Sequence, residues 1–197
     1  SAVLINDGST DNTASVARDA GANVITHNTN RGYDETLSDG FKHAVESDAD
    51  IVVTFDADDQ HRPEDIPRVI EPIQNEKAEI VVERRPRPAR AAERLFALYT
   101  EWRFGIDDPL SGFKAYDTGV YRDVGYFDRL SSIGTHLLVA TAKLGYRIIQ
   151  VDIGLETRED EPRFGHLKAN WVMLKALGRI ISFDIRTTRR TGEIRDT

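Results

Sequence analysis

Short apolar runs alternate with amphipathic stretches through the first half of the chain. Four of these runs predict strands, at residues 2–5, 24–26, 51–55 and 79–83. Between them apolar residues recur at helical spacing, as at Leu37, Phe41 and Val45. Repeated β-α units of this kind are typical of a mainly parallel sheet with helices on both faces. The pattern therefore predicts an α/β fold.

The second half of the chain is less regular. Its predicted elements are a basic loop at 84–90, a helix ending near 103, a helix at 136–144, a strand at 146–153, a charged loop at 156–165 and a helix at 166–183. Neither an internal repeat nor a linker interrupts the chain. We expect one domain over residues 1–185, followed by a polar, disordered tail at 186–197.

Composition narrows the class of protein. With 197 residues, 40% hydrophobic and 30% charged, the chain suits one globular domain with a real core. It has no apolar stretch of ~18 residues and no secretory signal at its start, which predicts a cytoplasmic protein, at most at the cytoplasmic face of a membrane. The absence of cysteine fits a reducing compartment. A net charge of −7 argues against a nucleic-acid binder, so any phosphate substrate must meet local cationic groups.

Two of the predicted strands end in acidic turns, at residues 6–7 and 56–58. In open α/β sheets ligands bind beyond the carboxyl ends of the strands. Unpaired carboxylates at one edge repel each other, and a divalent cation with a diphosphate would offset that repulsion. Mg²⁺ and Mn²⁺ favour carboxylate, amide and phosphate oxygens. The predicted metal ligands are therefore Asp56, Asp58 and Gln60, although each could also be a turn or helix-capping residue.

Five motifs follow one another along the chain. They are Asn6-Asp7-Gly8-Ser9-Thr10-Asp11, Asn30-Arg31-Gly32, Asp56-Ala57-Asp58-Asp59-Gln60-His61-Arg62-Pro63-Glu64-Asp65-Ile66, Asp108-Pro109-Leu110-Ser111-Gly112-Phe113-Lys114-Ala115, and Leu144-Gly145-Tyr146-Arg147-Ile148 with the loop from Arg158 to Gly165. In this order they resemble the motifs of family-2 inverting glycosyltransferases, in the dolichol-phosphate mannosyltransferase-like branch that uses polyprenyl phosphates. The resemblance implies the GT-A fold, the Rossmann-like fold of nucleotide-diphospho-sugar transferases.

The resemblance also implies which residues would bind the nucleotide-sugar that donates the sugar. Asp7 would bind the nucleotide base, with Gly8 and Ser9 beside it. Asp56 and Ala57 would contact the nucleoside.

The metal and the reacting groups are implied in the same way. Asp58 and Gln60 would hold Mg²⁺ or Mn²⁺ against the donor diphosphate. Arg158 and Arg163 would clamp phosphates, for which a forked guanidinium is suited. Ser111 would line the acceptor side. The implied catalytic residues are thus Asp58, Ser111, Arg158 and Arg163.

Two departures from the family pattern stand out. The strand and helix that the family places before its first motif are missing from this sequence, which puts donor binding and the sheet itself in question. The acidic residue that serves many relatives as a base aligns with His136, which we interpret as a helix-start residue rather than a base. A phosphate acceptor is already anionic and needs no base, which favours a polyprenyl phosphate over a sugar hydroxyl. His61 belongs to a motif near the metal, whereas His27, His43 and His166 are expected at the surface or in loops.

Two segments suggest contact with a lipid. The basic stretch at 84–94 could meet a lipid phosphate or a membrane surface, or be a solvated connector. In the last helix Lys168, Lys175 and Arg179 share one face opposite an apolar one. Such a helix either lies on a membrane or packs on the sheet.

We therefore predict a metal-dependent glycosyltransferase that moves a sugar from a GDP- or UDP-linked donor to a polyprenyl (dolichyl) phosphate with inversion, as in protein glycosylation. The alternatives are a family-2 enzyme with a saccharide acceptor, and a catalytically silent nucleotide-binding remnant. A nucleotidyltransferase is disfavoured because no glycine-rich basic loop follows the first strand.

Overall fold

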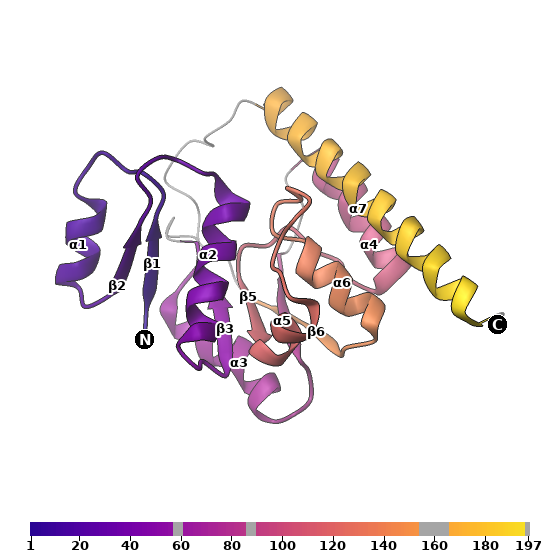
Figure 1. Ribbon diagram of the computed structural model, residues 1–197, viewed down its shortest axis with the longest axis horizontal. Coiled ribbons are helices and arrows are strands. Elements are labelled where there is room, and N and C mark those ends of the chain that lie inside the picture. Colours follow the sequence, from indigo (N-terminus) through magenta and orange to yellow (C-terminus); the bar gives the residue numbers. More distant parts are fainter. Residues whose placement is uncertain (57–60, 86–89, 154–165, 196–197) are drawn as a thin grey trace.

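The computed structural model describes residues 1–56, 61–85, 90–153 and 166–195 (Figure 1). For residues 166–167 and 189–195 it describes the backbone alone. Its elements are β1 (Val3–Asn6), α1 (Thr13–Asp19), β2 (Asn23–Thr26), α2 (Tyr33–Glu46), β3 (Ile51–Thr54), the 3₁₀ turn η1 (Pro63–Asp65), α3 (Ile66–Gln74), β4 (Ile80–Arg84), α4 (Ala91–Phe104), β5 (Lys114–Asp117), α5 (Thr118–Val124), α6 (His136–Leu144), β6 (Ile148–Asp152) and α7 (His166–Arg195).

The described strands form two groups. β3, β5, β4 and β6 make a four-stranded sheet in that order, and β1 pairs in parallel only with β2. β4 and β6 are parallel, whereas β5 runs antiparallel to both β3 and β4. β3, β4 and β6 therefore share one direction, and β5 is inserted between them in the opposite one.

The core lies on both faces of this sheet, and β4 shows why. Ile80 and Val82 pack into one apolar cluster with residues of α2, α5 and α6, while Val81 packs into another with residues of α3. All three side chains are fully buried. A continuous apolar run is what a strand covered on both faces requires.

A third apolar cluster joins α4, α6 and α7 through Phe96, Val139 and Ile180. Beside it, the buried carboxylate of Asp184 accepts hydrogen bonds from Tyr99 at 2.8 Å and Arg103 at 2.8 Å and pairs with Lys143. One acid on α7 thus fixes side chains of both α4 and α6. α4 and α7 lie side by side along the edge of the molecule (Figure 1).

The structure revises several predicted elements. β5 and α5 were not predicted. α7 continues to Arg195, past its predicted end near Phe183. The predicted domain bounds and the polar tail at 186–197 stay predictions. α7 packs on α4 and α6 rather than on the sheet, because its buried residues meet Phe96 and Val139. Within the described residues, no helix is long and apolar enough to cross a membrane.

β3, predicted as a strand at 51–55, is not the buried parallel strand that its continuous apolar run is typical of. It lies at the edge of the four-stranded sheet, pairs antiparallel with β5 and is only half-buried over Ile51–Val53. Its β-branched sequence is typical of a central strand, whereas its observed position is an edge.

Candidate active site

The turn after β1 is held by the carboxylate of Asp7. The backbone N–H groups of Arg31 and Gly32 each donate to it at 2.8 Å, and the His27 ring contacts it at 2.8 Å. Burial alone would raise the pKa of Asp7, but these contacts outweigh it and lower the pKa to about 2. Asp7 therefore ties the end of β1 to the Asn30-Arg31-Gly32 segment that leads into α2.

Gly8 allows the two segments to approach each other. Its φ of 77° lies in the left-handed region, and a Cβ there would stand 2.9 Å from the backbone nitrogen of Asn30. Asn6, two residues before Gly8, is buried, and its side-chain oxygen accepts the N–H of Ser9 at 3.2 Å. Ser9 is exposed beside this turn.

His27 is not the surface residue that we expected. It is 5% exposed, and its second ring nitrogen lies 2.9 Å from Asp39 of α2. Two carboxylates on opposite sides of one imidazole connect the β1 turn with α2. Sequence alone gave no signal for this role, because Asp39 lies twelve residues away along the chain.

Asp56 follows β3 and lies against the backbone of Gly112. A Cβ on Gly112 would clash with the Asp56 carboxylate. The side-chain hydroxyl of Thr54 fixes the same approach by donating to the Gly112 carbonyl at 2.8 Å. Asp56 and Gly112, which are far apart in sequence, therefore meet at one point.

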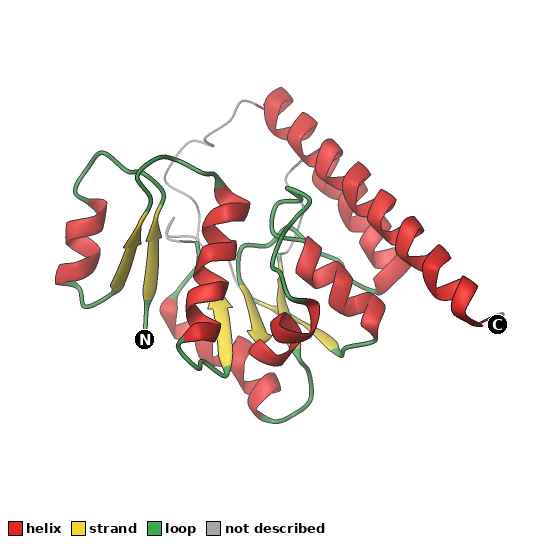
Figure 2. Ribbon diagram, viewed as in Figure 1, coloured by secondary structure: helices red, strands yellow, loops and turns green. Residues whose placement is uncertain are grey.

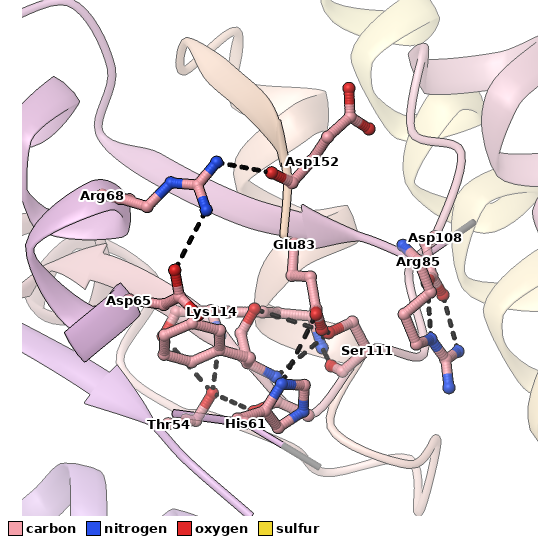
Figure 3. A network of polar contacts seen from close by, with 12 residues as sticks. Thr54, His61, Asp65, Arg68, Glu83, Arg85, Asp108, Ser111, Lys114 and Asp152 are labelled. Carbon is pink, nitrogen blue, oxygen red and sulfur yellow. Dashed lines mark hydrogen bonds and ion pairs between the residues drawn. The ribbon is translucent and has the colours of Figure 1, made fainter. Parts of the chain in front are cut away.

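The buried carboxylate of Glu83 holds the side chain of Ser111 in place (Figure 3). Its hydroxyl donates to Glu83 at 2.6 Å, and it accepts the N–H of Phe113 at 3.1 Å. His61 lies 3.4 Å from the other oxygen of Glu83 and packs against Phe113. Ser111 is only 1% exposed, and its hydroxyl faces Glu83 and the loop backbone. Its place on the acceptor side stays a prediction.

Basic and acidic groups alternate around this loop. Arg85 forms a forked pair with Asp108, at 2.6 and 2.8 Å (Figure 3). Buried Lys114 donates through Nζ to the Ser111 carbonyl. Burial lowers the pKa of Lys114 to about 8, although the nearby charges of Asp108 and Asp56 oppose that shift. Asp56 therefore lies in the field of a buried cation.

The basic stretch after β4 is already paired at both of its described ends. Arg84 contacts Asp152 at 2.7 Å and Asp107 at 3.2 Å, and Arg90 contacts Glu93 at 3.2 Å. These acids neutralise cations that we had considered for a lipid phosphate.

Tyr33 and His136 complete the comparison with the sequence. Tyr33 follows Gly32, and burial together with the charge of Asp56 raises its pKa. Tyr33 therefore belongs to the same edge of the fold as Asp56, and sequence reasoning missed it.

His136 is the first residue of α6, as expected, and is buried between Tyr126 and Phe183. Burial lowers its pKa to about 4, and its Nδ1 accepts the N–H of Arg129, so it is neutral at pH 7 and faces the core.

The remaining predicted site residues lie outside the described part of the chain. They are Ala57, Asp58, Gln60, Arg158 and Arg163. Among the described residues, no three His, Asp or Glu side chains are grouped to hold a metal ion. Of the predicted metal ligands, the structure thus places Asp56 alone.

Comparison with known proteins agrees with this architecture. Residues 2–118 match the family described as Glycosyl transferase family 2. The chain is 30% identical over 176 residues to the dolichyl-phosphate hexose transferase of Haloferax volcanii, covering 82% of this chain and 72% of that protein. It is 37% identical over 97 residues to a UDP-N-acetylglucosamine–dolichyl-phosphate N-acetylglucosaminyltransferase of Methanococcus voltae, covering 41% of this chain and 39% of that protein.

Among solved structures, a Mycobacterium tuberculosis glucosyl-3-phosphoglycerate synthase, crystallised with Mn²⁺ and UDP-glucose, superposes with a TM-score of 0.71. That match has 23% identity and covers 91% of this chain and 66% of the mycobacterial one. The chain belongs to glycosyl transferase family 2, and its fold is the GT-A fold. It spans well under half of the Methanococcus relative and about two thirds of the mycobacterial chain.

The Asp7 contacts predict a pH-dependent contribution to stability. The folded-state pKa of about 2 lies below the ordinary 3.8, so the contribution is present above pH 3.8 and disappears as the pH falls toward 2. We expect Asp7→Asn to lower the free energy of unfolding by about 1–2 kcal/mol at pH 6, and the difference from wild type to shrink between pH 4 and 2. Urea unfolding at several pH values measures this. Asp19→Asn, at the exposed end of α1, is the control; an equal, pH-independent loss in both variants would contradict the assignment.

The approach of Asp56 to Gly112 predicts that a methyl group is not tolerated there. Gly112→Ala should displace the Asp56 carboxylate and lower the free energy of unfolding by about 1–3 kcal/mol, as overpacking does. Gly178→Ala in α7, where a Cβ would meet no atom within 4 Å, should be neutral or stabilising. Thermal unfolding and the carboxyl ¹³C shift of Asp56 give the readout. An unchanged shift in Gly112→Ala would show that the two residues are not in contact.

Proposed function

We propose that this chain is the catalytic part of an inverting glycosyltransferase that moves a sugar from a nucleotide-sugar donor to a polyprenyl phosphate. The observation that carries the proposal is the meeting of Asp56 with the Gly112 loop at the carboxyl end of β3. Similarity over about four fifths of the chain to proteins named dolichyl-phosphate hexose transferase and undecaprenyl-phosphate mannosyltransferase, the latter from Micrococcus luteus, supports the acceptor class.

The donor would lie along the edge from the β1 turn to the β3 turn. Asp7 positions Gly32, Tyr33 follows it, and the Tyr33 hydroxyl lies within the field of Asp56. Three of the four lone pairs that a carboxylate offers are already taken at Asp7, which leaves room for one donor from a base. We assign Gly8 and Ser9 to the same edge.

The donor chemistry around Asp56 fits a hard divalent cation. Asp56 offers an oxygen ligand, and the Asp58 carboxylate and the Gln60 amide would complete a set that suits Mg²⁺ or Mn²⁺. The bound ion would offset charge on the departing diphosphate. Arg158 and Arg163 would contribute forked guanidinium contacts to the phosphates.

The buried position of His136 favours a phosphate acceptor over a sugar hydroxyl. An acceptor sugar hydroxyl would need a base, and neutral, buried His136 faces the core instead. A phosphate oxygen can attack the anomeric carbon directly, opposite the departing diphosphate, which inverts that carbon. In this arrangement Glu83 and Lys114 position the loop that carries Ser111, while Ser111 itself stays buried.

A calorimetric titration tests the donor site. GDP, UDP and their sugar conjugates are titrated with and without Mn²⁺, and we expect one nucleotide to bind only with the metal. Asp58→Ala should weaken that binding by at least tenfold, because a hard cation loses a charged ligand. Asp19→Asn is the charge-matched control. The failure of every nucleotide to bind the folded chain at millimolar concentration would contradict the proposal.

An apolar face suits an acceptor held in a bilayer. Leu95, Leu98 and Trp102 follow one another at helical spacing on α4 and are 51%, 60% and 80% exposed. Trp171, Leu174 and Ile185 form a similar exposed stripe on α7. Tryptophan is enriched at membrane–water interfaces, because its ring is apolar while its N–H can still reach water.

The two stripes lie on the same side of the helix pair. α4 and α7 run parallel, since Phe96 meets Leu177 and Ile180 while Arg103 meets Asp184 farther along. Successive residues of a helix are rotated about its axis by roughly 100°. Measured from the residues that join α4 to α7, this rotation places both stripes on the side of the helix pair that faces away from α6. After α4 the chain enters the segment that carries Ser111 and Gly112, so this apolar face is connected to the site.

Vesicle co-sedimentation tests the bilayer contact. The chain is mixed with vesicles of a neutral phospholipid containing a fraction of anionic lipid, and the variant pair Trp102→Ser and Trp171→Ser is compared with wild type. We expect the partition constant to fall at least tenfold, because burying each indole in the interface is worth more than about 1 kcal/mol. Val16→Ser, at a 63% exposed position on α1, is the control and should bind as wild type does. Equal sedimentation of all three proteins would remove this face from the proposal.

A further inference from the structure

A groove lies between α7 and the loop that leads into α6. Its volume is about 1000 Å³, and its lining includes Leu130 of that loop and Lys175, Arg179, Ser182, Phe183 and Arg186 of α7. Among the described residues, no aspartate or glutamate lines it, although the whole chain carries a net charge of −7. We call this cavity the α7 groove.

Three cations share the face of α7 that borders this groove. Lys175, Arg179 and Arg186 follow one another by whole turns of the helix, so their side chains lie on the same side of it. All three are exposed, and within the described residues none of them forms an ion pair with an acid. Neighbouring like charges on a helix repel each other. An anion in the groove would remove that repulsion.

The opposite face of the same helix treats charge differently. Asp184 is buried there and pairs with Arg103 of α4 and Lys143 of α6. Near the candidate active site, Arg84 and Arg85 are likewise paired with acids. The chain thus neutralises its other clustered cations internally, whereas the cations of the α7 groove depend on negative charge from outside the chain.

Hydrogen bonds hold the loop wall of the groove against α7 and α2. Arg179 donates to the carbonyl of Ser131 at 2.8 Å. From the other side, the Asp34 carboxylate of α2 accepts the N–H of Gly134 at 2.5 Å and that of Ile133 at 3.3 Å. In Figure 2 this loop, drawn in green, lies between α2 and α7. Both sides of the groove are therefore fixed to the rest of the fold.

The backbone of this loop is strained. Ser131 has a φ of 51° and Ile133 a φ of 58°, in the left-handed region that a β-branched residue rarely adopts. Such a conformation persists only where the surrounding contacts impose it. The contacts of Arg179 and Asp34 meet that need, and Asp128 adds another by accepting the N–H of Leu130 at 2.7 Å. The wall of the groove is thus formed before any ligand arrives.

The contact with Ser131 leaves most of the Arg179 guanidinium available. A guanidinium offers several N–H donors, and a carbonyl oxygen does not compensate its charge. Arg186 presents a second forked donor, and Lys175 presents an ammonium group. In the part of the chain that the structure describes, the Ser182 hydroxyl has no hydrogen-bond partner. Each of these four side chains can therefore donate to a ligand in the groove.

A ligand that accepts from all of these donors needs several oxygens and more than one negative charge. A phosphate group has both properties. We propose that the α7 groove binds one phosphate group, at residues separate from the proposed donor edge. The inference concerns this groove alone and does not depend on the proposed glycosyl transfer.

The same chemistry suits the phosphate of a lipid headgroup and that of a soluble phosphate ester. Lys175 favours the lipid, because its Nζ lies 5.1 Å from the centre of the Trp171 ring, in the exposed apolar stripe of α7. A phosphate at Lys175 would thus have its carbon chain beside an apolar surface. The test separates the two sources.

The first arm titrates inorganic phosphate at neutral pH and follows the amide and arginine side-chain NMR signals. If the ligand is a soluble ester, the largest shift changes should occur at Leu130, Arg179 and Ser182. Shift changes centred on Gly8 and Gly32 instead would place the phosphate at the donor edge and overturn the inference.

The second arm measures co-sedimentation with phosphatidylcholine vesicles, with and without phosphatidate. If the ligand is a lipid headgroup, phosphatidate should raise the partition constant by roughly tenfold or more, because each cation near an anionic surface adds attraction. Binding to these vesicles without any response to inorganic phosphate identifies the lipid as the source. A response to neither probe would overturn the inference.

A matched pair of double variants locates the phosphate. Lys175→Gln with Arg186→Gln removes two groove cations but keeps the Arg179 contact with the loop, and should weaken binding of the responding probe by roughly tenfold or more. Lys77→Gln with Arg122→Gln changes the net charge equally at exposed positions outside α7 and should bind as wild type does. Equal weakening in both would show a general charge effect and overturn the inference.

Two further readouts separate this test from those of the proposed function. Any gain in partition from phosphatidate should persist as a ratio in Trp102→Ser, which alters the apolar stripe of α4 and none of the groove residues. Loss of that gain in Trp102→Ser would assign it to the bilayer contact and overturn a lipid ligand for the groove. None of these measurements uses a nucleotide, so the groove and the donor site can fail independently.

Discussion

The insertion of β5 between β3 and β4, antiparallel to both, is the constraint on which the site depends. Because β5 returns in the opposite direction, the segment before it, with Ser111 and Gly112, arrives at the carboxyl end of β3. There the absence of a side chain on Gly112 lets the backbone meet Asp56. A parallel strand in this place would bring its amino end to the opposite edge of the sheet, and the two motifs would not meet.

Buried charge at this junction is balanced within the chain. Glu83 is fully buried, yet it accepts the Ser111 hydroxyl and lies beside His61. Lys114 is also buried and donates to the Ser111 carbonyl. A buried charge without partners would destabilise the fold by several kcal/mol, so these contacts make the polar interior possible. They also hold the loop in one conformation.

The sequence predicted the repeating part of the fold because local signals specify it. Apolar runs at β1 to β4 and the helical spacing in α2 and α6 need no distant partner to be recognised. β5 escaped notice because the residues Lys-Ala-Tyr-Asp have no apolar alternation, and only pairing with β3 and β4 makes them a strand. The length of α7 was underestimated because its last turns are polar.

The site residues divide in a similar way. Motif resemblance implied that Asp7 and Asp56 contact the donor, but it could not show that three contacts, from Arg31, Gly32 and His27, already occupy the Asp7 carboxylate. Such contacts depend on tertiary approach. Tyr33, Glu83 and the Asp39 partner of His27 lie outside the motifs on which the resemblance rests, so only the folded arrangement brings them into the site.

The edge position of β3 links the fold to the chemistry. Asp56 is anchored on one side by β5 and the Gly112 loop, while on the other side β3 borders a cavity of about 730 Å³ that Val3–Ile5 of β1 also line. The Asp7 turn is in the same position, held to α2 through Gly32 but paired to β2 alone. The distance between the two acidic turns is therefore set by α2, which packs on both strands.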